Sequence, residues 1–96
     1  MKLEDEYKLL IGAYYGIQEM DEYDLKVYIL KEIEECINSF IETSPINGYD
    51  YEKMALKLKE EIPLKTKLQD SLIILNRIDG PMELVLMIKK RIKDLN

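Results

Sequence analysis

The chain has 96 residues, a length that suits one domain with a small hydrophobic core. Its single cysteine and its lack of histidine exclude a disulfide framework and leave zinc without its usual ligands. The N-terminal residues are acidic where a signal peptide is basic, and no apolar run reaches the roughly 18 residues of a membrane span. We therefore expect one domain over residues 1–96, without metal or cofactor, in the cytoplasm.

The net charge of -5 is unevenly distributed along the chain. Residues 1–50 contain 12 acidic and 4 basic side chains, a net charge of -8, whereas residues 51–96 contain 7 acidic and 10 basic side chains, a net charge of +3. This distribution is not typical of a general nucleic-acid-binding protein, and it allows an acidic surface that meets a basic partner. The alternative is that the charged side chains have no partner and only make the outer faces of the helices soluble in water.

The first predicted helix ends near Met20, because apolar side chains recur up to that point with helical spacing. These side chains are Leu3, Tyr7, Leu10, Tyr14 and Ile17. Gly12 and Gly16 fall on one side of the same helix, a spacing that allows another helix to approach closely. Asp21 is the expected N-cap of the next helix, with Asp24 in its first turn.

The second predicted helix extends to Thr43 and has the clearest apolar stripe in the chain. The stripe consists of Ile29, Ile33, Cys36, Ile37, Phe40 and Ile41. We interpret Cys36 as a small apolar packing residue rather than a nucleophile, because the chain has no histidine to accept its proton.

A turn follows, with the sequence Ser44-Pro45-Ile46-Asn47-Gly48-Tyr49-Asp50-Tyr51. Turn formation explains the proline, asparagine and glycine, and Asp50 is suited to cap a third helix. Ile46 and Tyr49 need another explanation. One is structural, with Tyr49 packed against Met54 as a hydrophobic staple and Ile46 closing the end of the bundle. The other is functional, with Ile46, Tyr49 and Tyr51 as an exposed anchor for a partner.

Three further helices are predicted after this turn. The third ends at Pro63, and the fourth starts at a capping box formed by Thr66 and Gln69. The inward residues of the fourth helix are expected to be Leu68, Leu72, Leu75 and Ile78. Gly80 and Pro81 then separate it from the last helix, with Gly80 suited to a helix end and Pro81 to the first helical position. The whole pattern predicts an all-α bundle of about five short helices.

The last helix is unusual because its first two turns are apolar on nearly all sides. Met82, Leu84, Val85, Leu86, Met87 and Ile88 are interrupted only by Glu83. Either this helix is central and surrounded by the others, or part of it forms the surface of a homodimer or a partner site. The sequence leaves these two alternatives open.

The sequence lacks a phosphate loop, a Ser-His-Asp or Cys-His set and a metal-ligand cluster, so we do not expect an enzyme. Our leading hypothesis is a protein-interaction module, acting as an inhibitor, adaptor or assembly subunit. The expected partner-binding residues are Glu34, Glu35 and Glu42 for charge, and Ile46, Tyr49 and Tyr51 for anchoring. The competing hypothesis is a nucleic-acid-associated regulator that uses the basic C-terminal residues Lys89, Lys90 and Lys93.

The turn residues and tyrosines that follow the acidic helix resemble a segment of colicin-type immunity proteins, which are small acidic inhibitors of nucleases. The resemblance ends with this segment, because three more predicted helices follow it here. It therefore implies neither membership of that family nor a role for any residue.

Overall fold

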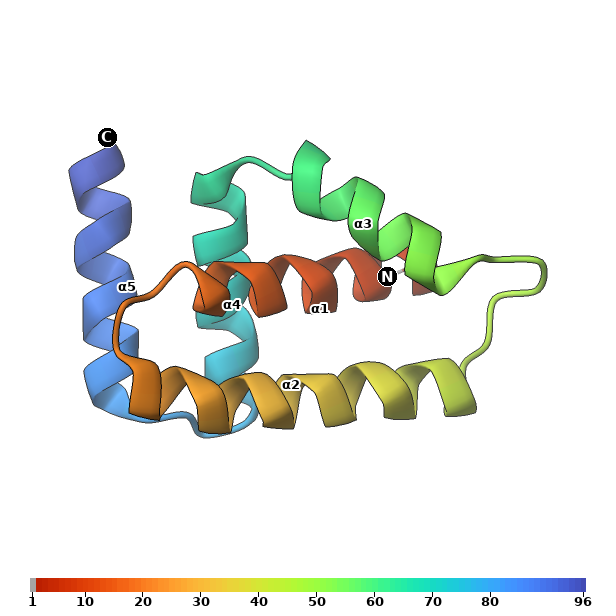
Figure 1. Ribbon diagram of the computed structural model, residues 1–96, viewed down its shortest axis with the longest axis horizontal. Helices are drawn as coiled ribbons and strands as arrows, with labels where there is room; N and C mark the ends of the chain where they lie inside the picture. The colour runs from red at the N-terminus through yellow and green to blue at the C-terminus, as the bar shows by residue number, and fades with distance from the viewer. Residues whose placement is uncertain (1) are drawn as a thin grey trace.

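The computed structural model describes residues 2–96 and contains five helices (Figure 1). In chain order they are α1 (Leu3–Gln18), α2 (Tyr23–Thr43), α3 (Tyr51–Glu61), α4 (Leu64–Arg77) and α5 (Met82–Leu95). No strand occurs within the described residues, and the helices enclose a hydrophobic core. The predicted all-α bundle is therefore confirmed.

The central helix is α1, which contacts α2, α3 and α4. Figure 1 shows α1 in orange and red between α2 and α3, while α5 stands at one end of the molecule beside α4. The side chains of α1 are buried on most of its circumference, namely Tyr7, Leu9, Leu10, Ile11, Ala13 and Ile17. The alternative in which the apolar C-terminal helix is central is thus wrong, because α1 is the helix that other helices cover on several sides.

The close crossing of α1 and α4 depends on two glycines one turn apart. A Cβ atom at Gly16 would lie 2.4 Å from the carbonyl oxygen of Lys67, and one at Gly12 would lie 2.1 Å from a carboxylate oxygen of Asp70. The buried hydroxyl of Ser71 lies 3.1 Å from a carbonyl oxygen of α1 and 2.8 Å from one of its own helix. The predicted close helix approach at these glycines is confirmed, and the partner is α4.

Three of the predicted helix boundaries are correct for the expected reason. Asp50 is the N-cap of α3, and its carboxylate accepts a hydrogen bond of 3.2 Å from the backbone N–H of Lys53. Helix α3 ends at Glu61, and its C-cap Ile62 directly precedes Pro63, which cannot donate a backbone hydrogen bond. Helix α2 ends at Thr43, as expected from the proline that follows two residues later.

Two other boundary predictions are wrong. The N-cap of α2 is Glu22 rather than Asp21, and its side chain makes no capping bond. Helix α4 begins at Leu64, so Thr66 lies inside the first turn and does not form the predicted capping box. The physical reason is Pro63, whose φ of -61° and extended ψ already suit an N-cap position, so the helix starts earlier.

The end of α4 also differs from the prediction. Asp79 rather than Gly80 adopts the left-handed conformation, with φ of 52°. The N–H of Gly80 then donates a hydrogen bond of 2.8 Å to the carbonyl oxygen of Leu75, which closes the last turn in a Schellman arrangement. Pro81 is the N-cap of α5 and not its first helical residue. A Cβ atom at Gly80 would lie 2.4 Å from the Leu75 side chain, so a larger residue there would force this buried leucine to move.

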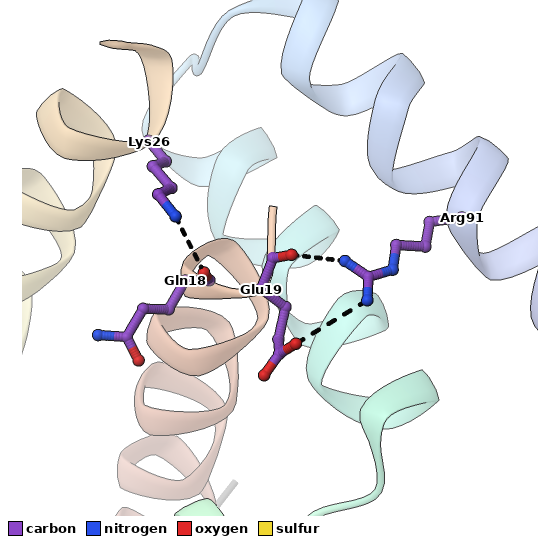
Figure 2. A network of polar contacts seen from close by, with 4 residues as sticks. All are labelled: Gln18, Glu19, Lys26 and Arg91. Carbon is purple, nitrogen blue, oxygen red and sulfur yellow. Dashed lines mark hydrogen bonds and ion pairs between the residues drawn. The ribbon is translucent and has the colours of Figure 1, made fainter. Parts of the chain in front are cut away.

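A polar network connects the C-terminal end of α1 to α2 and α5 (Figure 2). Lys26 donates a hydrogen bond of 3.3 Å to the carbonyl oxygen of Gln18, and Arg91 donates one of 2.5 Å to that of Glu19. Arg91 also lies 3.8 Å from the Glu19 carboxylate. Since α1 has no basic residue in its own last turn, these two cations satisfy its terminal carbonyl groups and complement the negative end of its dipole.

We expect Arg91→Met to lower the free energy of unfolding by about 1 kcal/mol, because methionine keeps apolar contact area but cannot donate to the Glu19 carbonyl. Urea unfolding followed by circular dichroism measures the change. Lys90→Met is the matched control, since Lys90 is exposed and makes no hydrogen bond or ion pair within residues 2–96. An equal loss of stability in both variants would show that the network at the end of α1 is not stabilising.

None of the helices in residues 2–96 has the combination of length and hydrophobicity that a membrane span requires.

Candidate functional site

A long exposed surface lies along α2, the longest helix of residues 2–96. Only Ile29 and Ile33 of this helix are fully buried. At 100° per residue, a set of exposed residues falls within one arc on its other side, and we call this set the outer face of α2. Its members are Tyr23, Asp24, Val27, Tyr28, Lys31, Glu34, Glu35, Asn38 and Glu42.

The two ends of the outer face differ in chemistry. Its first two turns carry large side chains that are mostly in solvent, with Tyr23 at 70%, Tyr28 at 65% and Val27 at 46% exposure. Its later turns carry Glu34, Glu35 and Glu42, all exposed. The first half of the face therefore offers apolar contact area with polar tips, and the second half offers negative charge.

Glu34 is the only carboxylate of the outer face that is engaged within the described part of the chain. Its Oε1 accepts a hydrogen bond of 3.2 Å from the hydroxyl of Tyr14 on α1. Burial and the neighbouring Glu34 charge both raise the pKa of Tyr14, so this tyrosine remains a hydrogen-bond donor at neutral pH. The Tyr14 and Tyr15 rings meet edge to face at 5.2 Å between centroids. Glu34 thus borders a groove between α1, α2 and α3.

The two neighbouring carboxylates line different grooves. Glu34 lines the groove that also contains Tyr15 and Tyr51, whereas Glu35 lines a groove of about 530 Å³ between α1, α2 and α4. This separation follows from helix geometry, because adjacent residues point about 100° apart. The structure therefore places Glu34 and Glu35 on one outer face, but it does not bring them to one pocket.

Cys36 lines the second of these grooves and packs partly against the core. Burial is the main cause that raises the pKa of its thiol, and the nearby charges of Glu32 and Glu35 add to it. A thiol of this kind is protonated at neutral pH and is a weak nucleophile. The interpretation of Cys36 as a packing residue agrees with its position.

The turn before α3 is held by a cluster of three tyrosine rings. The ring of Tyr7 lies 5.7 Å from that of Tyr49 and 5.1 Å from that of Tyr51, both edge to face. The Tyr7 hydroxyl donates a 2.7 Å hydrogen bond to the carbonyl oxygen of Tyr51, and the Tyr51 hydroxyl accepts a 2.5 Å hydrogen bond from the N–H of Ile46. Burial raises the pKa of Tyr7 to about 12.

Tyr49 and Tyr51 are therefore half-buried residues that attach the turn to α1, and the half-buried Ile46 is held to Tyr51 through its backbone N–H. Tyr49 and Met54 pack against the same small core around Tyr7, which is the position that the staple interpretation requires. Parts of all three side chains remain accessible at the end of α2. The structure places these residues next to the acidic end of the outer face of α2, without placing them on it.

The last helix has a buried side and a charged or apolar outer side. Leu84 and Ile88 are fully buried, whereas Met82 is 66% and Leu86 is 58% exposed. Lys89, Lys90 and Lys93 are exposed. The apolar surplus that the sequence indicated is thus only partly covered, and the homodimer through this helix stays a prediction.

The sequence interpretation missed Asp70, a half-buried acid on α4. It lines a groove of about 520 Å³ between α1, α3 and α4, which we call the Asp70 groove. Burial raises the pKa of this carboxyl to about 6. Asp70 directly precedes Ser71 and lies about one helical turn before Ile74, and both of these residues are buried. This position was the only sequence signal that Asp70 is partly buried. The expected inward leucines of α4 indicated a different buried side of the helix.

No cluster of three or more potential metal-ligating side chains of the histidine, cysteine, aspartate or glutamate type occurs among residues 2–96. Comparisons of the chain with protein-family models, with curated proteins and with solved structures find no match.

Proposed function

We propose that this chain is a protein-interaction module that acts by binding another protein with a basic surface, as an inhibitor, adaptor, immunity-type or assembly subunit. The observation that carries the proposal is the outer face of α2. It combines three exposed large side chains, Tyr23, Val27 and Tyr28, with four exposed carboxylates on one helix.

The chemistry of this face supports protein binding for two reasons. Tyrosines supply large contact area and a polar tip at a small cost in conformational entropy, and they are enriched in binding surfaces. The carboxylates of Glu34, Glu35 and Glu42 add negative charge that attracts a basic partner and fixes its orientation. The exposed parts of Ile46, Tyr49 and Tyr51, directly after the acidic end of α2, extend the proposed contact area.

A binding role is favoured over catalysis by the state of the available groups. Cys36, the only thiol, has a raised pKa and no histidine beside it. Asp70 has a strongly shifted pKa, but no second acid or base within the described residues forms a hydrogen bond with it. Since general acid and base catalysis needs positioned pairs of groups, we infer that the chain binds rather than transforms its partner.

Affinity capture from the lysate of the source cell, with a charge-reversal variant, tests the proposal. We expect Glu34→Lys with Glu35→Lys to weaken recovery of a stoichiometric protein partner by about tenfold or more, because both substitutions turn attraction into repulsion at the contact. The matched control is Glu60→Lys with Glu83→Lys, which changes the net charge equally at exposed positions of α3 and α5. Circular dichroism confirms that each variant is folded.

The control variant decides between specific contact and general charge. If both double variants lose the partner equally, net charge rather than the outer face of α2 governs binding, and the site assignment is wrong. Recovery of nucleic acid alone, lost when Lys89, Lys90 and Lys93 are neutralised, would replace this proposal by the regulator hypothesis.

A further inference from the structure

The Asp70 groove has walls of mixed chemistry and lies between three helices. Apolar side chains form much of its lining, and charged groups surround them. The lining residues used below are Leu9 and Lys8 from α1, Ile62 from the end of α3, and Asp70, Ile73 and Arg77 from α4. Ile73 is 47% exposed, so the apolar lining continues onto the surface. None of the groove residues comes from α2.

The Asp70 carboxylate has no partner in this groove. Within residues 2–96 it forms no hydrogen bond and no ion pair. One of its oxygens instead lies directly over Gly12, where even a methyl group would not fit. A carboxylate held against the backbone of a neighbouring helix loses hydration without gaining a compensating contact, which disfavours its charged form.

The charged groups that face the groove do not neutralise Asp70. Arg77 forms an ion pair with Glu6, and Lys8 forms no ion pair with any acid of residues 2–96. Asp5 of α1 and Glu61 of α3 add negative charge at the rim. Glu61 lies 4.0 Å from Lys57, in a pair that is exposed to solvent and therefore weak. The groove thus contains a partly desolvated acid whose nearby cations are engaged elsewhere or at a distance.

We propose that the Asp70 groove receives an arginine side chain of a partner protein, with Asp70 as its counter-ion. Charge complementarity favours a cation, since three carboxylates face two cations there. Arg77 is held by Glu6, whereas Glu61 has only a weak, exposed partner in Lys57. The apolar lining favours arginine over lysine, because a guanidinium is weakly hydrated and its stem packs on apolar surface.

This inference goes beyond the proposed function, because it assigns a second contact site on other helices. Its failure would leave the test of Glu34 and Glu35 on α2 unaffected. In the same way, evidence against partner binding at the outer face of α2 would leave the arginine site intact. Each proposal can therefore be rejected without rejecting the other.

The experiment is an NMR titration of the isotopically labelled full chain with N-acetyl-arginine amide. The neutral isostere N-acetyl-citrulline amide is the control probe. We expect the arginine probe to shift the backbone amides of Leu9, Ile62 and Ile73, and to lower the pKa that the carboxyl carbon of Asp70 reports, because a bound cation stabilises the charged form. The citrulline probe should do neither.

Two variants give the specificity of the response. We expect Asp70→Asn to weaken binding of the arginine probe by about tenfold, the effect of losing one charge-assisted contact. Asp94→Asn, the same change at an exposed position of α5, should leave the affinity unchanged. Equal binding to wild type and Asp70→Asn, equal responses to both probes, or no change of the Asp70 titration at the highest soluble probe concentration would each overturn the proposal.

A third variant examines whether the chain supplies its own counter-ion. Lys8→Met should leave the pKa of Asp70 in the free protein unchanged and should not weaken binding of the arginine probe. If Lys8→Met instead raises the Asp70 pKa, then Lys8 already neutralises this acid in solution, and an external arginine is not required.

Discussion

We expect Gly16→Ala to lower the free energy of unfolding by about 2–3 kcal/mol. The new Cβ atom would lie 2.4 Å from the carbonyl oxygen and 2.8 Å from the carbonyl carbon of Lys67. These atoms belong to the backbone of α4, so only a displacement of the whole helix can relieve the clash. Because α4 also carries α5, the displacement would disturb contacts at that end of the core.

Gly12→Ala is the matched control, since it adds the same methyl group one turn earlier on the same face of α1. Its Cβ atom would meet the Asp70 carboxylate at 2.1 Å, but a side-chain carboxylate can rotate away toward solvent. Both variants gain about 1 kcal/mol of helix propensity, so this term cancels in the comparison. Urea unfolding should therefore rank Gly16→Ala clearly below Gly12→Ala in stability. Equal stabilities would contradict the proposed rigidity of the crossing between α1 and α4.

The second large effect concerns the pH dependence of stability at Asp70. Its pKa is about 6 in the folded protein, against 3.8 for an unperturbed aspartate. Between these two values the folded state binds more protons than the unfolded state, so stability falls as the pH rises from about 4 to about 6. Below this window both states are protonated, and the stabilising contribution is fully present. Above it the contribution is lost, because the carboxylate is charged in both states and poorly solvated in the folded one.

Asp70→Asn removes the cost of the poorly solvated charge while it keeps the size of the side chain. At pH 7 we expect the variant to be more stable than the wild type by about 1–2 kcal/mol, after allowance for the part of the carboxyl that solvent still screens. At pH 3.5 the difference should vanish, because aspartic acid is then neutral as well. Thermal or urea unfolding at several pH values between these limits measures the difference directly. A constant difference across the range would exclude titration of Asp70 as its cause.

The two Asp70 predictions have opposite signs for stability and for binding. Asp70→Asn should stabilise the folded chain at neutral pH, and it should weaken the contact with the arginine probe. A residue that only packs would not combine these two results, since its replacement would not affect an external cation. The combination is typical of functional sites, where a strained or desolvated group reduces stability.

Local sequence features predicted the number of helices and their approximate extents. The apolar stripe of α2, the Asp50 cap and the stop at Pro63 depend on side-chain spacing and backbone chemistry within a few residues. The errors at Asp21 and Thr66 have a local origin too. In each case the chain offered more than one start for a helix, and the side chains of these two residues do not form the expected capping bonds.

The candidate site was only partly accessible from the sequence. Glu34, Glu35 and Glu42 could be assigned to an outer face of α2, because helical period and charge suffice for this assignment. The inward packing of Tyr51 could not, since it depends on Tyr7, which is 44 residues away along the chain. The Asp70 groove was also inaccessible, because three helices of unknown arrangement form it.

The sequence by itself determined that the chain forms five helices, that it has few groups suited to catalysis, and that its acids concentrate in the first half. These properties follow from short-range periodicity and composition. Only the tertiary structure decided that α1 is central, that α5 lies outside, and that Asp70 is desolvated over Gly12. Burial depends on which helices cross and how closely, and this arrangement is set by contacts between residues far apart in the chain.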